Sequence, residues 1–172
     1  LGFANQFAMV ARAGVAVTTL SEAARPEQRW RLGVGYEFLE RPDGWAAMKE
    51  VYPLPLAGEA RAMDLGLLYR ALDAGEVDLI AANSTDPQLA SGRYRVLEDN
   101  RGFFPPYQAC LAVRRDSLAR WPALRGALEQ LQGRIDESTM RRMNAQVALE
   151  ARTAEAVARD QAQILWGEAS HG

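Results

Sequence analysis

The stretch from Asp64 to Ala82 constrains the fold of this chain more than any other, because it reads as one helix leading directly into one buried strand. Asp64 can cap the helix, whose apolar residues recur on one face at helical spacing: Leu65, Leu68, Tyr69 and Leu72. Gly75 stands where a glycine commonly ends a helix. The run from Val77 to Ala82 (VDLIAA) is typical of a buried parallel strand. A helix followed by such a strand is the repeating unit of doubly wound α/β folds, which is the class we expect.

The segments before this unit continue the same alternation. Residues 3–12 and 30–38 read as strands, and Thr19–Glu22 fits a capping box that starts a short helix between them. A further helix is expected from Pro42, because proline suits the first helical turn. Strand, helix, strand, helix, strand is therefore the predicted order of the first half.

The second half of the chain has a different sequence pattern. Residues 94–98 and 109–114 read as strands that flank a turn-rich stretch. From Asp116 onward the pattern is helical throughout, and Asp136 and Thr153 are placed to cap the last two helices. A mainly helical C-terminal half is therefore predicted.

Composition and charge argue against some classes of partner. Hydrophobic residues make up 48% of the 172 residues, which is enough for a core. The net charge is −2 and the 20 Lys and Arg residues are scattered, so a nucleic acid partner is not expected. The sequence shows neither an apolar run of the roughly 20 residues that span a bilayer nor a signal peptide.

The residues of catalytic and metal chemistry are sparse. The single histidine, His171, lies beside the C-terminus, which argues against a histidine-based triad or a multi-histidine metal site. The sequence shows no nucleophile–base pair and no phosphate-cradling glycine loop, so we expect neither an enzyme nor a cofactor. Cys110 is the only cysteine, which excludes an internal disulfide, and its apolar neighbours predict a buried structural thiol.

Four blocks of sequence occur in a recognisable order: GFANQFAMVAR, YEFLERPDGW, MDLGLLYRALDAGEVDLIAANSTD and LEDNRGFFPPYQACLAVRRDSL. In this order they resemble substrate-binding proteins of the glycine betaine/choline/carnitine ABC-transporter family. The resemblance runs from Gly2 to near Asp160. It implies a type-II periplasmic-binding-protein fold, with two α/β lobes and a ligand cleft at the hinge.

The resemblance also implies a division of the chain. Residues 1–86 match lobe two of the family as a doubly wound α/β lobe, and residues 87–172 match the C-terminal, largely helical part of lobe one. In the family a further segment precedes this opening, so we expect the chain to lack the N-terminal half of lobe one. The apolar helix faces of residues 87–172 then need a cover. A second copy of the chain, by domain swapping in one version, or a missing N-terminal region would supply it.

Aromatic rings enclose a quaternary ammonium group in this family through cation–π attraction. The resemblance implies that Tyr107, at the end of FFPPY, is one ring of this cage, whereas from its neighbours alone it could equally pack on Pro105 and Pro106. Phe7 stands at the tyrosine of the opening block and keeps the ring without the hydroxyl. Asn83 stands at another cage tyrosine and cannot make a cation–π contact, which opens the site to a more polar ligand.

Arg41, in ERPDG, stands at the arginine that binds the ligand carboxylate in this family, where a guanidinium can donate two parallel hydrogen bonds. From its neighbours alone it could also be a surface arginine paired with Glu40 or Asp43. Hydrogen bonds to the ligand are expected from nearby polar side chains: Asn5, Gln6, Ser84 and Thr85.

The resemblance therefore implies a protein that binds a small quaternary-ammonium or zwitterionic solute of the glycine betaine, choline or carnitine class. It implies a periplasmic or otherwise extracytoplasmic location, and the membrane subunit of an ABC transporter as partner. The alternative is a truncated, self-associating domain with an altered ligand or no transport role, whose interface would include the helix beyond Asp160.

Overall fold

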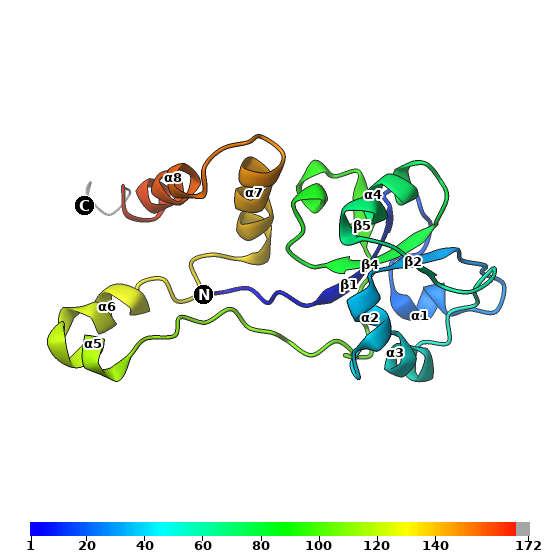
Figure 1. Cartoon of the computed structure of the whole chain (residues 1–172), viewed down its shortest axis with the longest axis horizontal. Helices are drawn as coiled ribbons and strands as arrows, with labels where there is room; N and C mark the ends of the chain where they lie inside the picture. Colours follow the sequence, from blue (N-terminus) through cyan, green and yellow to red (C-terminus); the bar gives the residue numbers. More distant parts are fainter. Residues whose placement is uncertain (168–172) are drawn as a thin grey trace. The chain divides into compact units, whose positions relative to one another are not determined.

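The computed structural model describes residues 1–167, which form two compact units that are each discontinuous in sequence (Figure 1). The sheet unit consists of Gln6–Ser84 and Ser91–Pro106. The helical unit consists of Leu1–Asn5, Thr85–Ala90 and residues 107–167. His171 and the end of the predicted C-terminal interface lie outside the described residues.

The sheet unit is built on a five-stranded mixed sheet with strand order β3-β2-β4-β1-β5 (Figure 1). Its strands are β1 (Phe7–Arg12), β2 (Leu32–Val34), β3 (Arg61–Ala62), β4 (Leu79–Asn83) and β5 (Tyr94–Val96). β2 runs parallel to β3 and β4, whereas β1 runs antiparallel to β4 and β5. β4, the apolar run of the sequence, lies at the centre, because its side chains are buried on both faces.

Helices cover both faces of this sheet. α4 (Leu65–Asp73) packs on one face through Leu68, Tyr69 and Leu72, with Gly75 in the left-handed conformation (φ 71°) just beyond its end. The other face carries α1 (Leu20–Ala23), α2 (Tyr36–Glu40) and α3 (Trp45–Val51). Figure 1 shows this division, with α4 above the sheet and the other three helices below it.

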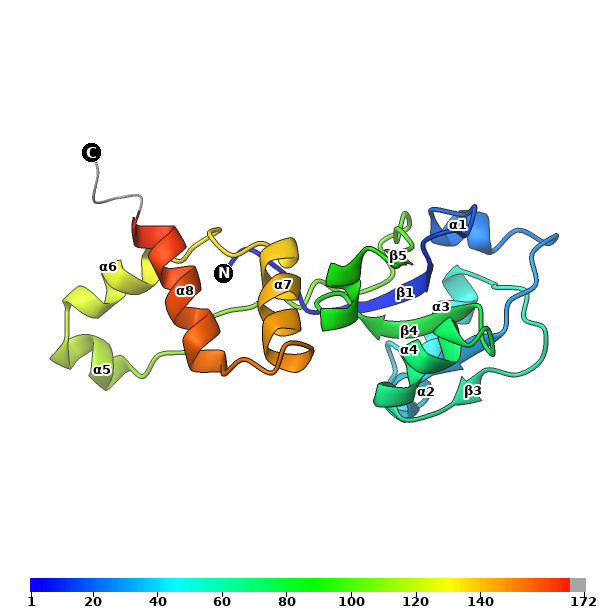
Figure 2. The same cartoon turned by 90° about the horizontal axis from the view of Figure 1, so that it is seen from above.

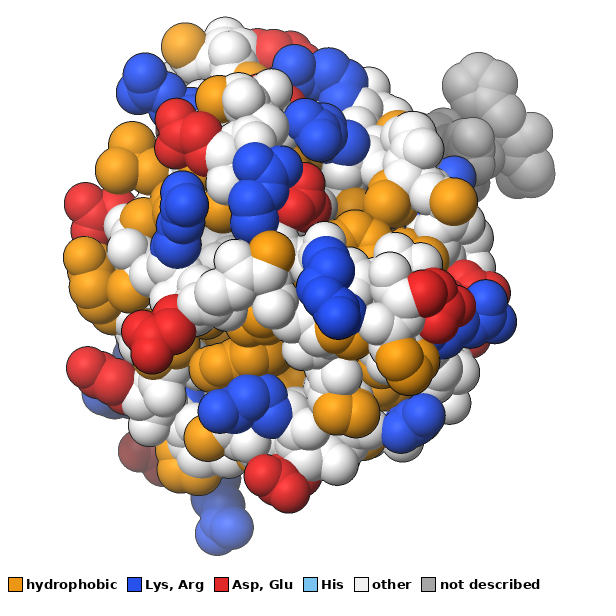
Figure 3. Space-filling model, turned by 90° about the vertical axis from the view of Figure 1, so that its right-hand side faces the viewer, with side chains coloured by type: hydrophobic (Ala, Val, Ile, Leu, Met, Phe, Trp, Pro, Cys, Tyr) orange, Lys and Arg blue, Asp and Glu red, His pale blue; other side chains and the backbone are white. Residues whose placement is uncertain are grey.

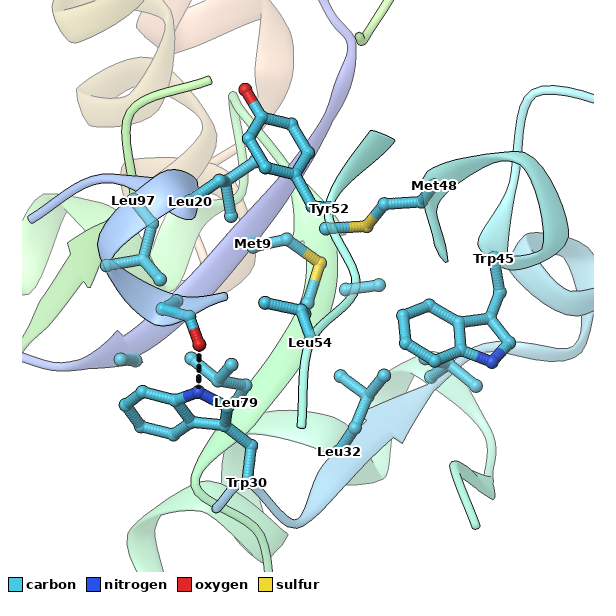
Figure 4. Close-up of a cluster of buried hydrophobic side chains, with 14 of the residues drawn as sticks. Met9, Leu20, Trp30, Leu32, Trp45, Met48, Tyr52, Leu54, Leu79 and Leu97 are labelled. Carbon is cyan, nitrogen blue, oxygen red and sulfur yellow. Dashed lines mark hydrogen bonds between the residues drawn. The ribbon is translucent and has the colours of Figure 1, made fainter. Parts of the chain in front are cut away.

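On the α1–α3 side of the sheet, the hydrophobic core contains side chains from β1, β2 and β4 and from the three helices that cover them. Met9 of β1, Leu32 of β2 and Leu79 of β4 lie against side chains from the helices (Figure 4). The indole Nε1 of Trp30 donates a 2.7 Å hydrogen bond to the carbonyl of Ala23, which satisfies the polar atom of this buried ring. The predicted capping box is confirmed here, since Thr19 and Glu22 cap α1 reciprocally.

The helical unit contains α5 (Arg115–Arg120), α6 (Ala123–Glu129), α7 (Glu137–Ala148) and α8 (Ala154–Gly167). Figure 2 shows α7 and α8 side by side, with α5 and α6 as a second pair. The predicted caps are confirmed, because Asp136 accepts a hydrogen bond from the N–H of Thr139 and Thr153 accepts one from the N–H of Ala156. The short 3-10 helix η1 (Pro87–Ser91) follows β4 in the chain.

Large apolar side chains remain exposed on this unit. No residue of α5 or α6 is buried, and Trp121, at the end of α5, is 53% exposed. Other exposed side chains of the unit are Leu111, Val147, Leu149, Ile164 and Trp166. Within the described residues, the helical unit therefore buries little of its apolar surface.

Three expectations from the sequence are wrong in detail. The strand expected over residues 30–38 ends at Val34, because the extended residue Gly35 starts α2, which buries Phe38. The helix expected from Pro42 begins instead at Trp45, after Gly44. Residues 109–114 form no strand, because the pairing with the first residues of the chain stops at the bridge between Ala4 and Gln108 and the backbone hydrogen bonds of Ala109 with Phe3 and Leu1.

The prediction of a buried Cys110 is wrong, because the extended segment that carries it has no sheet partner and the thiol is exposed. Basic and acidic side chains are interspersed on the face drawn in Figure 3. Among the described helices, none has the length and apolar character to cross a membrane.

Candidate functional site

One end of the β1–β4 ladder brings three of the predicted site residues together. Phe7 is the first residue of β1 and lies opposite Asn83, the last residue of β4. One position further out, the N–H of Ser84 donates to the carbonyl of Gln6 at 2.8 Å, and the N–H of Gln6 donates to Ser84 Oγ at 3.3 Å. Gln6, Phe7 and Asn83 are therefore held as neighbours by backbone pairing.

The ring of Phe7 has an aromatic neighbour and a cationic neighbour. Phe38 of α2 packs edge-on against it, with the ring centroids 4.9 Å apart. Arg41, the C-cap of α2, places its Cζ atom 5.6 Å from the centroid of the Phe7 ring. A guanidinium at this distance over a ring makes a cation–π contact. The two residues expected to bind the opposite ends of a betaine therefore lie in contact.

The guanidinium of Arg41 donates hydrogen bonds to two carboxylates of its own chain. Its Nε and Nη2 atoms lie 2.8 and 2.9 Å from the two oxygens of Asp43, which is a bidentate pair. Its Nη1 atom lies 3.2 Å from Glu37 Oε1, one helical turn earlier. The pairing with Asp43 is thus one of the two that its sequence neighbours allowed.

The other two predicted site residues belong to the helical unit. The hydroxyl of Thr85 donates to Asn5 Oδ1 at 2.7 Å, and the carbonyl of Thr85 accepts a hydrogen bond from Asn144 Nδ2 at 2.9 Å. The N–H of Asn5 donates to the carbonyl of Tyr107 at 3.0 Å, and the Tyr107 side chain is 44% exposed. Asn5 therefore connects Thr85 with Tyr107 inside this unit.

The turn that precedes Tyr107 is fixed by one partly buried hydrogen-bonded pair, Tyr52 and Asp99. Burial, followed by the hydrogen bond to Asp99, raises the pKa of Tyr52 to about 12. Burial alone would raise the pKa of Asp99, but hydrogen bonds from Tyr52 and from the backbone N–H groups of Phe104, Phe103 and Arg101 outweigh it and lower the pKa below its usual value. Asp99 is therefore held as a carboxylate that orders the start of the FFPPY segment.

Sequence reasoning missed some residues of this arrangement. The contact of Glu37 with Arg41 was predictable from the sequence, because a spacing of four residues is that of a helical ion pair. Phe38 was hidden, since it lies in a segment expected to be a strand. Asn144 has no sequence signal, because its contact with Thr85 joins residues 59 positions apart.

Metal chemistry has no visible support in residues 1–167. In that part of the chain, no three His, Cys, Asp or Glu side chains gather in a way that could hold a metal ion. The arrangement around Phe7 instead combines an aromatic face, a guanidinium and hydrogen-bonding amides. These groups suit a ligand with a cationic and an anionic end.

Comparison with protein families gives one match that spans most of the chain. The model of the family described as the substrate-binding domain of the ABC-type glycine betaine transport system matches residues 1–161. A crystal structure of a glycine betaine/carnitine/choline ABC transporter superposes with a TM-score of 0.86 at 29% identity, over 96% of this chain and 62% of that one. The expected α/β fold of type-II periplasmic binding proteins is thereby confirmed.

Two curated relatives match over long stretches. A glycine-betaine-binding protein of Pseudomonas aeruginosa is 35% identical over 140 residues, which is 81% of this chain and 45% of the relative. The ergothioneine transport permease/ergothioneine binding protein EgtU of Helicobacter pylori is 28% identical over 164 residues, which is 93% of this chain and 30% of the relative. The chain thus spans less than half the length of either relative.

Proposed function

Because this chain belongs to the family of substrate-binding domains of ABC-type glycine betaine transport systems, we propose that it binds a small quaternary-ammonium or zwitterionic solute for uptake by an ABC transporter. The observation that carries the proposal is the family match over residues 1–161, together with the contact between Phe7 and Arg41. An extracytoplasmic location and a transporter membrane subunit as partner are parts of the same proposal.

Each end of a betaine has a chemical counterpart in this arrangement. The face of Phe7 attracts a trimethylammonium group by a cation–π contact, which contributes about 0.5–2 kcal/mol per ring. The guanidinium of Arg41 can hold a carboxylate through two parallel hydrogen bonds. Tyr107, Gln6 and Thr85 remain candidate ligand contacts, to be tested by the same substitutions.

Asn83 favours ligands that offer hydrogen bonds as well as positive charge. Its amide can donate and accept hydrogen bonds, but it has no aromatic face for an ammonium group. The names of the matched proteins include glycine betaine, carnitine, choline and ergothioneine. Carnitine and choline each carry a hydroxyl group, and ergothioneine carries a sulfur-bearing ring with N–H groups, so these three solutes offer Asn83 a neutral polar partner.

Isothermal titration calorimetry with these four solutes tests the proposal. We expect one of them to bind. Phe7→Leu should weaken binding about two- to thirtyfold, which corresponds to the loss of one cation–π contact. Trp121→Leu removes an exposed ring of α5 and serves as the matched control, with affinity unchanged. Binding that is equally strong in Phe7→Leu, Arg41→Gln and Tyr107→Ala would refute the proposed site.

A second candidate function is self-association with an altered ligand or no transport role. The observation that favours it is the apolar surface that the helical unit leaves exposed, including Trp121 and Ile164. Sedimentation over a hundredfold range of protein concentration tests this candidate. A monomer at every concentration that still binds a quaternary amine would refute it.

A further inference from the structure

A cavity of about 570 Å³ lies at the end of the β1–β4 ladder that is opposite to Phe7 and Asn83. Arg12, the last residue of β1, is five positions beyond Phe7, so at about 3.4 Å per residue this cavity is separated from the candidate site by roughly 17 Å. The sheet unit alone supplies its lining: Arg12, Gly14, Val15, Arg29, Trp30 and Asp78.

Asp78 is the acidic side chain of this lining, and its charge already has a partner. Its carboxylate oxygens accept hydrogen bonds from Nε and Nη2 of Arg31 at 2.8 and 2.6 Å, and the backbone N–H of Arg31 donates a third at 3.0 Å. These hydrogen bonds lower the pKa of Asp78, although burial opposes them. Asp78 and Arg31 therefore form a neutral pair, which leaves the charges of Arg12 and Arg29 in excess at the cavity.

Arg12 and Arg29 are each fixed to the backbone through a single nitrogen. Nη1 of Arg12 donates to the carbonyl of Leu72 at 3.3 Å, and Nη1 of Arg29 donates to the carbonyls of Pro26 and Gln28, both at 2.7 Å. In the described part of the chain, the Nε and Nη2 atoms of these two arginines have no hydrogen-bond acceptor, and neither guanidinium forms an ion pair. Two anchored guanidinium groups therefore line one cavity with their bidentate edges unoccupied.

We infer that this cavity binds a phosphate group through Arg12 and Arg29. One guanidinium edge matches two oxygens of a phosphate, and a tetrahedral phosphate has enough oxygens for two such edges. A carboxylate has only two oxygens, which a single edge fills. The inference goes beyond the proposed function, because it involves neither Phe7 nor Arg41.

The size and lining of the cavity allow two sources of this phosphate group. Small-molecule sites commonly have volumes of about 300–1,000 Å³, so the cavity has room for more than inorganic phosphate. Val15 and Trp30 add apolar atoms to the lining. The phosphate can therefore be free or belong to a small monoester.

Titration of the ¹⁵N-labelled full chain with inorganic phosphate, followed by NMR, tests the inference. We expect the Nε–H signals of Arg12 and Arg29 and the indole N–H signal of Trp30 to shift until they saturate. Sodium chloride at the same ionic strength should leave them in place, because general screening does not depend on the anion. Phenyl phosphate in a second titration separates the two sources, since tighter binding than that of inorganic phosphate identifies a monoester, and equal binding identifies the free ion.

Substitutions show whether the two guanidinium edges carry the binding. Arg29→Gln should weaken phosphate binding about tenfold, because it removes one charged bidentate edge. Arg12→Lys keeps the charge without the edge and should weaken binding about threefold. Arg25→Gln is the matched control, since Arg25 is an exposed arginine of the same segment that does not line the cavity, and it should change the affinity less than twofold.

Two results would overturn the inference. One is the absence of a saturable shift at these three signals in the wild-type protein, and the other is equal phosphate affinity in Arg29→Gln and Arg25→Gln. Glycine betaine affinity, measured on the same variants, should stay at the wild-type value because the two sites lie at opposite ends of the ladder. The phosphate site and the proposed function can thus fail independently of each other.

Discussion

The phenolic oxygen of Tyr52 lies 2.6 Å from Asp99 Oδ1, although the two residues are 47 positions apart in the sequence. The same oxygen accepts a hydrogen bond from the N–H of Arg101, and Asp99 Oδ2 accepts one from the N–H of Phe104. The buried end of α3 is thereby joined to the turn that leads into FFPPY. This pair connects the core of the sheet unit with the segment that ends at Tyr107.

Tyr52→Phe should lower the free energy of unfolding by about 1.5–3 kcal/mol, because it leaves the Asp99 carboxylate and the Arg101 N–H without their shared partner. Urea denaturation followed by circular dichroism measures the change. Tyr36→Phe is the matched control, since that ring is 58% exposed on α2, and it should stay within about 0.5 kcal/mol of wild type. Equal effects of the two substitutions would show that the Tyr52 hydroxyl adds no stability.

Asp99 should make the protein sensitive to acid. Its pKa is lowered in the folded state, so the stability that it contributes is fully present above its unfolded-state pKa of about 3.9 and is lost as the pH falls through the lower folded value. Between pH 5 and pH 2 the free energy of unfolding should therefore decrease less steeply in Asp99→Asn than in wild type. Urea denaturation at a series of pH values gives both slopes, and parallel slopes would contradict this assignment.

Gly44→Ala should destabilise the protein by about 1–3 kcal/mol, because the new methyl group would overlap the carbonyl oxygen of Phe38. Gly66→Ala is the matched control in the same unit. A Cβ atom at Gly66, in α4, meets nothing within 4 Å, so this substitution should be neutral or stabilising by up to about 1 kcal/mol. Thermal melting of both variants separates overlap from the general effect of replacing glycine.

Cys110 should react with a thiol reagent in the native protein. The thiol is exposed and is the only one in the chain, so 5,5′-dithiobis(2-nitrobenzoic acid) should release one equivalent of chromophore without denaturant. Cys110→Ser should release none. A thiol that reacts only after denaturant is added would mean that this segment is covered in solution.

The elements that were predictable from the sequence are those whose signals are local. The Thr19–Glu22 capping box, the Asp136 and Thr153 caps and the helix–strand unit around Gly75 all depend on residues a few positions apart. The strand expected at 109–114 failed because a strand needs a partner, and partners are set by the whole topology. The same limit applied to Cys110, whose apolar neighbours predicted a cover that the described chain does not provide.

For the candidate site, residue types were more predictable than pairings. Phe7, Asn83 and Gln6 were named from the sequence, and their proximity follows from the antiparallel register of β1 with β4. The roles of Phe7, Arg41, Asn83, Tyr107, Thr85 and Gln6 in ligand binding stay predictions until affinities are measured. The bidentate pair between Arg41 and Asp43 was only one of two alternatives, because sequence spacing alone does not choose between Glu40 and Asp43.

The discontinuous make-up of the two units has a consequence for biosynthesis. Phe3 and Asn5 find their backbone partners in Ala109 and Tyr107, and Leu1 is 108 positions from its own partner, Ala109. Every residue of the sheet unit has left the ribosome once Pro106 emerges, whereas the helical unit still lacks most of its residues at that moment. The nascent chain can therefore complete the sheet unit first, and residues 1–5 gain their backbone partners only when residues 107–109 follow.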